Sequence, residues 1–295
     1  MTFNDNAKIN PNRVSRRGRN TGIAIGGGGL LVVGLFLLSQ LLGVDLTGLA
    51  PAIQGGGTGS GQQGEPLADC DTGAEANASI DCRIAGAADS LDTYWGQTLP
   101  QFGGTYRSTQ IVLFSGQTDT GCGGATSAVG PFYCPADETI YVDTAFYDEL
   151  RTRFGSSGGP LAEMYVIAHE WGHHIQNITG IMSGLDLQNA GPDSDGVRLE
   201  LQADCFAGAW VGAAPSITDE NGVSFLEPVT EEQIRDALSA ASAVGDDRIQ
   251  QSTQGQVTPE TWTHGSSESR QKWFLVGANG GPDACNTFDV DGSQL

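Results

Sequence analysis

LAEMYVIAHEWGHHIQNITG, residues 161–180, is the stretch that decides how this sequence folds. Its length and apolar content are typical of a helix, which would set His169 and His173 on one face, so that both imidazoles point the same way. Glu170 would lie about 100° around the helix from His169. The HExxH spacing therefore suits two ligands for one metal ion, with a carboxylate beside them to hold a water molecule.

A third ligand has to come from elsewhere, because a five-residue pattern also occurs by chance and two histidines leave zinc short of a protein ligand. The sequence predicts a second helix over 197–212, which carries Glu200 and, one turn later on the same face, Asp204. We expect Glu200 to bind the metal and Asp204 to accept the other imidazole N–H of His169. An exposed acidic helix face is the alternative.

The other histidines and Trp171 have less specific settings. His174 follows a ligand directly and would point about 100° away from the metal, so we interpret it as a structural or solvated residue. We expect Trp171 to pack in the core. His264 precedes a short helix that Ser266 or Ser267 would cap. It is a candidate donor to the oxyanion of a tetrahedral intermediate, and a surface or capping role is the alternative.

Composition and charge bound the class of protein. A chain of 295 residues with 39% hydrophobic residues can form one large or two ordinary domains with a packed core. The formal net charge is -21, and after residue 44 the chain has nine basic and 34 acidic residues. A field of that sign repels phosphates, so we expect no nucleic-acid partner and interpret the acidity as a solvated surface.

The cysteines indicate an oxidising compartment. There are six of them with no CxxC pair, which argues against a cysteine zinc cluster and favours disulfides. Fifteen connectivities are possible for six cysteines. Short local loops favour one of these, with the pairs Cys70–Cys82, Cys122–Cys134 and Cys205–Cys285.

The first 67 residues change character twice. Residues 1–20 are polar and basic, and we expect a disordered cytoplasmic tail. Residues 21–44 are 24 positions without a charge, enough for a helix to cross a hydrocarbon core of about 30 Å. We expect a single-pass anchor in the cell membrane, with a cleaved signal peptide as the alternative. Residues 45–67 form a Gly-rich linker, and the basic cluster before the anchor places residues 68–295 outside the cytoplasm.

The remaining patterns predict an α+β fold, mainly helical with a small sheet. Tyr141 and its neighbours are candidates for a sheet edge that pairs with an extended peptide, with core packing as the alternative. Asp143 suits the N-cap of a helix, and Thr230 with Gln233 suits a capping box. Besides the two helices above, the expected elements are helices at 80–99, 143–153 and 230–243 and strands at 110–114 and 139–143, with a glycine-rich loop at 121–135.

Taken together, these segments resemble the neutral zinc metallopeptidase family of bacterial membrane-anchored proteins. The resemblance covers nearly the whole chain, including the basic N-terminus, the apolar segment and the Gly-rich linker. The motifs that carry it are GCGGATSAVGPFYCPADETIYVD at 121–143, AHEWGHHIQNITG at 168–180, RLELQADCFAGAW at 198–210 and THGSSESRQKWF at 263–274.

The order HExxH, then Glu, then Asp four residues later is also similar to the thermolysin-like gluzincin arrangement. That resemblance implies a zincin-like domain in which His169, His173 and Glu200 bind one zinc ion. It implies Glu170 as the general base and Asp204 as the residue that orients His169. The loop at 182–196 is longer than the corresponding part of thermolysin, and His264 is the least secure transfer.

The expected activity is hydrolysis of peptide bonds outside the cytoplasm by a membrane-anchored zinc endopeptidase. Zinc would lower the pKa of a bound water, and Glu170 would take its proton and pass it to the leaving amine. Two alternatives stay open: a catalytically inactive, zinc-stabilised binding or scaffolding module, and a metal hydrolase of a non-peptide bond. The sequence identifies neither the peptide or protein substrate nor the oligomeric state.

Overall fold

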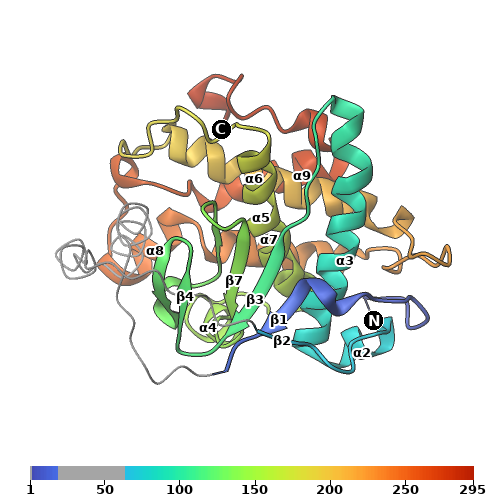
Figure 1. The fold of residues 1–295 in the computed structure, drawn as a ribbon. Helices are drawn as coiled ribbons and strands as arrows, with labels where there is room; N and C mark the ends of the chain where they lie inside the picture. Colours follow the sequence, from blue (N-terminus) through green and yellow to red (C-terminus); the bar gives the residue numbers. More distant parts are fainter. Residues whose placement is uncertain (1, 19–63) are drawn as a thin grey trace.

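The computed structural model describes residues 2–18 and 64–295, which form a mixed helical and sheet structure (Figure 1). The predicted anchor at 21–44 and most of the predicted linker at 45–67 lie outside the described residues. Within the two described ranges, no helix is both long enough and apolar enough to cross a membrane.

The main sheet has five strands in the order β2-β1-β3-β7-β6. β1, β3 and β7 run parallel, while β2 and β6 are antiparallel to their neighbours and form the two edges. The predicted strands at 110–114 and 139–143 are confirmed. The strand bounds are β1 Val14–Arg16, β2 Glu65–Pro66, β3 Gln110–Phe114, β6 Phe132–Cys134 and β7 Thr139–Asp143.

The glycine-rich stretch at 121–135 is not simply a loop. It contains β5, which pairs with β4 in a separate two-stranded sheet, and edge strand β6 of the main sheet. β4 spans Gln117–Thr120 and β5 spans Gly123–Thr126.

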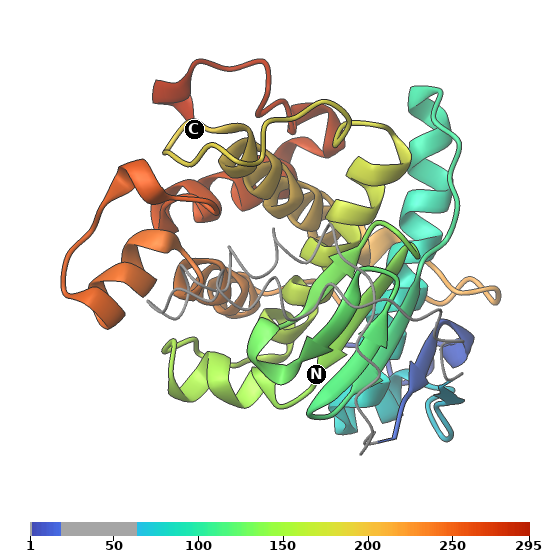
Figure 2. The same cartoon turned by 60° about the vertical axis from the view of Figure 1, so that its left-hand side comes forward.

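The helices pack around α5, which contains the HExxH motif. α5 contacts α3, α6 and α7 on its helical sides and β6 and β7 on its sheet side. In Figures 1 and 2 the sheet lies below α5. Helices α6 and α9 lie above α5. The helix bounds are α2 Gly73–Ala78, α3 Ile80–Thr98, α4 Phe146–Thr152, α5 Pro160–Ile178, α6 Asp195–Ala213, α7 Glu231–Ala243, α8 Asp246–Gln254 and α9 Ser267–Gly280.

Glycines let the central helices approach closely. A Cβ added at Gly172 of α5 would lie 3.0 Å from the Cα of Ala203 on α6. One added at Gly277 of α9 would lie 1.8 Å from the carbonyl oxygen of Cys205 on α6. Since the absence of a side chain permits both contacts, α6 is held against α5 and α9 at backbone distance.

The helix predicted to begin at Asp143 begins later. Asp143 ends β7, and its carboxylate accepts hydrogen bonds from the backbone N–H of Ala145 and of Gly116, each at 3.0 Å. The helix that follows, α4, starts at Phe146. The two capping residues of the C-terminal helices are as predicted: Thr230 forms a capping box with Gln233 on α7, and Ser266 caps α9.

The prediction that residues 1–20 are disordered is wrong for residues 2–18. Phe3, Ile9 and Val14 are buried in the main core, and β1 pairs with β3 along its whole length. The carboxylate of Asp219 accepts the backbone N–H of Lys8 at 2.7 Å. The prediction failed because the segment is mostly polar, and its few apolar side chains were not recognised as part of the core.

The prediction that Tyr141 lies at a sheet edge is also wrong. β7 is bonded to β3 on one side and to β6 on the other, and Tyr141 is 2% exposed. Its ring stacks on Phe132, and its hydroxyl donates to Asp137. Core packing, the alternative interpretation, is the observed one.

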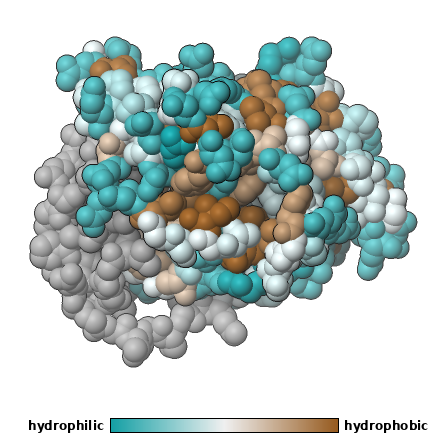
Figure 3. All heavy atoms as spheres, turned by 90° about the horizontal axis from the view of Figure 1, so that it is seen from above, coloured by the Kyte–Doolittle hydropathy of each residue, from teal (hydrophilic) through white to brown (hydrophobic). Residues whose placement is uncertain are grey.

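The predicted disulfides are all present, as Cys70–Cys82, Cys122–Cys134 and Cys205–Cys285. The last one joins α6 to the segment after α9. The face seen in Figure 3 carries a band of hydrophobic residues between polar ones. Among the described residues, the large hydrophobic side chains that are exposed are Phe102, Val257 and Leu275.

Candidate metal centre

His169, His173 and Glu200 come together where α5 faces α6. Each offers one possible ligand atom, and these three atoms lie within 4.8 Å of one another. Among the described residues, no other three His, Cys, Asp or Glu side chains come together in this way. The Nε2 atom of His169 is 3.1 Å from one oxygen of Glu200, and the Nε2 atom of His173 is 3.5 Å from the other. The structure thus brings together the three predicted ligands.

The positions of these residues follow from helix geometry and close packing. His169 and His173 share one face of α5 because they are four residues apart. Glu200 reaches them because α6 crosses α5 at Gly172, where no side chain keeps the helices apart. The long loop at 182–196 changes the sequence separation without displacing Glu200 from the histidines.

Asp204 orients His169, as the sequence predicts. Its carboxylate oxygen Oδ1 lies 2.9 Å from the Nδ1 atom of His169. An ionised carboxylate only accepts, so Nδ1 carries a proton and Nε2 is the nitrogen that can bind a metal ion. The pKa of His169 reflects this setting: burial lowers it, but the charges of Asp204 and Glu200 outweigh burial and raise it to about 10. The site therefore favours positive charge.

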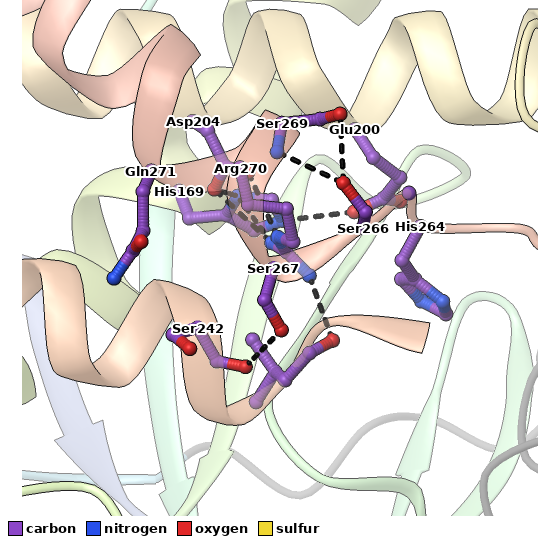
Figure 4. Close-up of polar contacts among 12 residues, drawn as sticks. His169, Glu200, Asp204, Ser242, His264, Ser266, Ser267, Ser269, Arg270 and Gln271 are labelled. Carbon is purple, nitrogen blue, oxygen red and sulfur yellow. Dashed lines mark hydrogen bonds and ion pairs between the residues drawn. The ribbon is translucent and has the colours of Figure 1, made fainter. Parts of the chain in front are cut away.

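Arg270 is a buried partner of Asp204 that the sequence alone does not single out. Its guanidinium donates to both oxygens of Asp204 (Figure 4). The hydroxyl of Tyr165 donates to one of the same oxygens. The sequence gives only a weak indication that Arg270 is buried. Arg270 lies in the stretch ESRQKWF, close to Trp273 and Phe274, which are buried.

Glu170 lies beside the three ligands and outside their group. It is 8% exposed. Burial raises the pKa of its carboxyl group to about 7, against the positive charge of His169 and a hydrogen bond from the backbone of Tyr133, which both lower it. Tyr133 is on β6, so the carboxylate lies between the metal-binding face of α5 and the edge of the sheet. A carboxyl group with this pKa exchanges protons readily near neutral pH.

His264 is held in place by Asp246, although the sequence shows nothing that fixes it. One oxygen of Asp246 accepts the backbone N–H groups of Thr263, His264 and Gly265 at 2.6 to 3.0 Å. The other lies 3.4 Å from Nδ1 of His264. Burial lowers the pKa of His264, but the charges of Glu200 and Asp246 raise it overall. Figure 4 shows His264 on the Glu200 side of the cluster.

His174 and Trp171 point away from the centre, as the helical period requires. His174 is fully buried; its Nε2 atom lies 2.7 Å from the carbonyl oxygen of Arg107 and its Nδ1 atom 3.1 Å from the Tyr133 hydroxyl. Trp171 is also fully buried. The His174 ring packs edge-on against Tyr133 of β6 and against Trp171.

Comparison with known proteins now adds the family. The family model described as "Putative neutral zinc metallopeptidase" matches residues 4–288. The chain belongs to this family. The match begins within the N-terminal segment, in agreement with the packing of residues 2–18 into the core.

Relatives in the family are similar over most of their length. "Uncharacterized protein Rv2575" of Mycobacterium tuberculosis is 52% identical over 229 residues, which is 77% of each chain. "Uncharacterized protein YpfJ" of Escherichia coli K12 is 42% identical over 272 residues, 89% of this chain and 87% of the relative. No solved structure matches the chain at a significant level.

The residues present fit zinc. Two imidazole nitrogens and a carboxylate are the donor set of catalytic zinc sites, which leave one position for water or substrate. Both histidines hold their Nδ1 atoms against oxygen acceptors, so both Nε2 lone pairs turn toward Glu200. A structural zinc site would use four protein ligands, and the described residues bring three together.

Proposed function

We propose that this protein is a zinc-dependent endopeptidase in which Glu170 is the general base. The observation that carries the proposal is the convergence of His169, His173 and Glu200 beside a buried carboxylate that is not part of the ligand group. The family to which the chain belongs supports the same reaction class.

Zinc held by His169, His173 and Glu200 would supply Lewis acidity, lowering the pKa of a bound water toward 7 and polarising the scissile carbonyl. The chain supplies the proton transfers. Glu170 takes a proton from the attacking water and then passes that proton to the leaving amine. His264, fixed by Asp246, donates to the oxyanion that forms at the carbonyl.

The substrate is a peptide in an extended conformation, held along β6. Within residues 2–18 and 64–295, this strand is one edge of the main sheet and pairs with β7 alone. The interaction of Tyr133 with Glu170 places that edge next to the general base. Main-chain pairing with an edge strand binds a peptide largely independently of its side chains, and so supports an endopeptidase.

The peptidase acts outside the cytoplasm at the cell membrane. The three disulfides support an oxidising compartment. The uncharged segment at 21–44, outside the described residues, is long enough to attach the protein to a bilayer.

Digestion of a peptide library by the full-length protein tests the proposal. Cleavage is expected with zinc, with loss on addition of a chelator and recovery on return of zinc. A zinc-loaded protein that cleaves no peptide contradicts the peptidase assignment, and cleavage that survives the chelator contradicts the metal. Cleavage by the Glu170→Gln variant at the wild-type rate would show that the general base is elsewhere.

A further inference from the structure

Two buried amide side chains lie directly behind His173 and have no part in the proposed chemistry. Gln176 is on α5, one turn after His173, and is fully buried; Gln202 is on α6 and is 7% exposed. Burying an amide is costly unless its polar atoms are bonded. Both side chains are bonded at each end.

The bonds form a chain from a backbone carbonyl to the ligand. Gln202 donates from Nε2 to the carbonyl oxygen of Cys285 at 2.9 Å, and its Oε1 accepts from Nε2 of Gln176 at 3.1 Å. Gln176 donates from the same nitrogen to the carbonyl oxygen of Leu199 at 2.7 Å. Its Oε1 lies 2.8 Å from Nδ1 of His173.

The two carbonyls fix the direction of the whole chain, because a carbonyl oxygen can only accept. The nitrogen of Gln202 must face Cys285, and the nitrogen of Gln176 must face Leu199. Each amide therefore turns its oxygen toward the next member of the chain, and the oxygen of Gln176 faces the imidazole of His173. That oxygen requires a proton on Nδ1, so the Nε2 lone pair of His173 faces Glu200.

The far end of the chain is anchored by a disulfide. Cys205 is on α6, one turn after Gln202, and its partner Cys285 supplies the carbonyl that Gln202 bonds. The bridge therefore holds the acceptor next to the face of α6 that carries Gln202.

We propose that Gln176 and Gln202 are positioning residues for the zinc ligand His173, and that the Cys205–Cys285 disulfide anchors them. This rests on the zinc site of the proposed function, and it predicts that zinc binding weakens when the bridge is removed. Groups that orient a ligand histidine typically change metal affinity 10- to 100-fold when they are removed.

The first test is Gln202→Met in the full-length protein, which keeps the side-chain volume and removes both bonds. The zinc dissociation constant, measured by competition with a chromophoric chelator, is expected to rise about 10- to 100-fold. The visible spectrum of the Co²⁺-loaded protein should change as well, because the ligand field reports the orientation of His173. Gln271→Met is the matched control: Gln271 makes one bond, to the carbonyl oxygen of Leu238, and points away from the cluster (Figure 4).

The second test compares two disulfides. Replacing Cys205 and Cys285 by serine is expected to weaken zinc binding and alter the Co²⁺ spectrum, whereas replacing Cys70 and Cys82 should leave both as in the wild type. If Gln202→Met and Gln271→Met bind zinc equally well, the positioning role is overturned, whether or not the cysteine variants fold.

These measurements separate the inference from the peptidase assignment. A wild type that binds zinc but cleaves no peptide, with weaker binding in Gln202→Met, supports the positioning chain and refutes the peptidase. A wild type that binds no Zn²⁺ refutes both.

Discussion

Arg270 of α9 donates from Nε to one oxygen of Asp204 on α6 at 2.8 Å and from Nη2 to the other at 3.0 Å. The two side chains are 3% and 0% exposed. Burial raises the pKa of Asp204, but the charges of Arg270 and His169 outweigh it and lower the pKa overall. Because Asp204 also orients His169, the pair ties α9 to the metal centre.

Removing one member of this pair should destabilise the fold strongly. Arg270→Met leaves the Asp204 carboxylate buried without its cation, which costs about 3–5 kcal/mol of the free energy of unfolding. Denaturant titration measures the change. The control is Glu231→Gln, which breaks the 3.9 Å ion pair with Arg235 between two exposed side chains and should change little. A similarly small change in Arg270→Met would mean that the buried pair has no structural role.

Glu170→Gln should retain zinc and lose turnover. The amide cannot take a proton from water, and loss of a general base lowers the rate about 10²- to 10⁴-fold. Peptide cleavage and zinc content are measured on the same preparation. Unchanged cleavage contradicts the role of Glu170, and loss of zinc from this variant would instead make Glu170 a ligand.

His173→Ala should lose the metal, as measured by elemental analysis of the purified protein. His174→Gln is the matched control, because it changes the adjacent histidine but leaves a side chain that can bond the Arg107 carbonyl. We expect the control to retain zinc. Equal loss in both variants would point to a general disturbance of α5 and away from a specific ligand.

Phe3→Ala should destabilise the protein by about 3–5 kcal/mol, since it empties a fully buried site. The ring lies against α3 at Gly86, where an added Cβ would be 2.6 Å from it. Thermal or denaturant unfolding provides the measurement. Phe102→Ala is the comparison, because Phe102 is 50% exposed and should cost much less. Equal effects would show that the N-terminal segment does not contribute to the core.

Acid should weaken the loop that holds His264. Burial raises the pKa of Asp246, but the hydrogen bonds from His264 and Thr263 and the charge of His264 lower it below its usual value of 3.8. The stability that this carboxylate contributes is therefore present above about pH 4 and is lost as the pH falls through the lower pKa of the folded state. The measurement is the difference in the free energy of unfolding between the wild type and Asp246→Asn. This difference should become smaller below pH 4. A difference that does not change with pH contradicts the stabilising role of the Asp246 carboxylate.

Local patterns predicted much of the fold and most of the site. The 3.6-residue period located α5 and α6, and capping residues located α7 and α9. The HExxH spacing, followed by Glu200 and Asp204, was enough to predict which side chains meet. The helix signals are local because each depends on residues within one helix, whereas the pairing of α6 with α5 was predicted from zinc's need for a third protein ligand.

The missed features are contacts between segments far apart in the sequence. Whether β7 is an edge or an interior strand depends on β6 and β3, and no residue within β7 decides it. Arg270 reaches Asp204 from another helix, and Gln202 bonds a carbonyl after α9. These contacts depend on where two helices cross. Glycines allow a close crossing, but they do not determine which helix will be the neighbour.

The place of β1 in the sheet constrains where the active site can be. β1 lies between β2 and β3, and the uncharged segment at 21–44 is in the connection between β1 and β2. A single crossing of a bilayer would put the two ends of that connection in different compartments, and β1 could not pair. In the folded protein, residues 2–18 and 64–295 form one structure, in which Arg16 of β1 bonds Asp81 of α3. If the protein is attached to a membrane, an epitope at the amino terminus should therefore report which side holds the candidate metal centre.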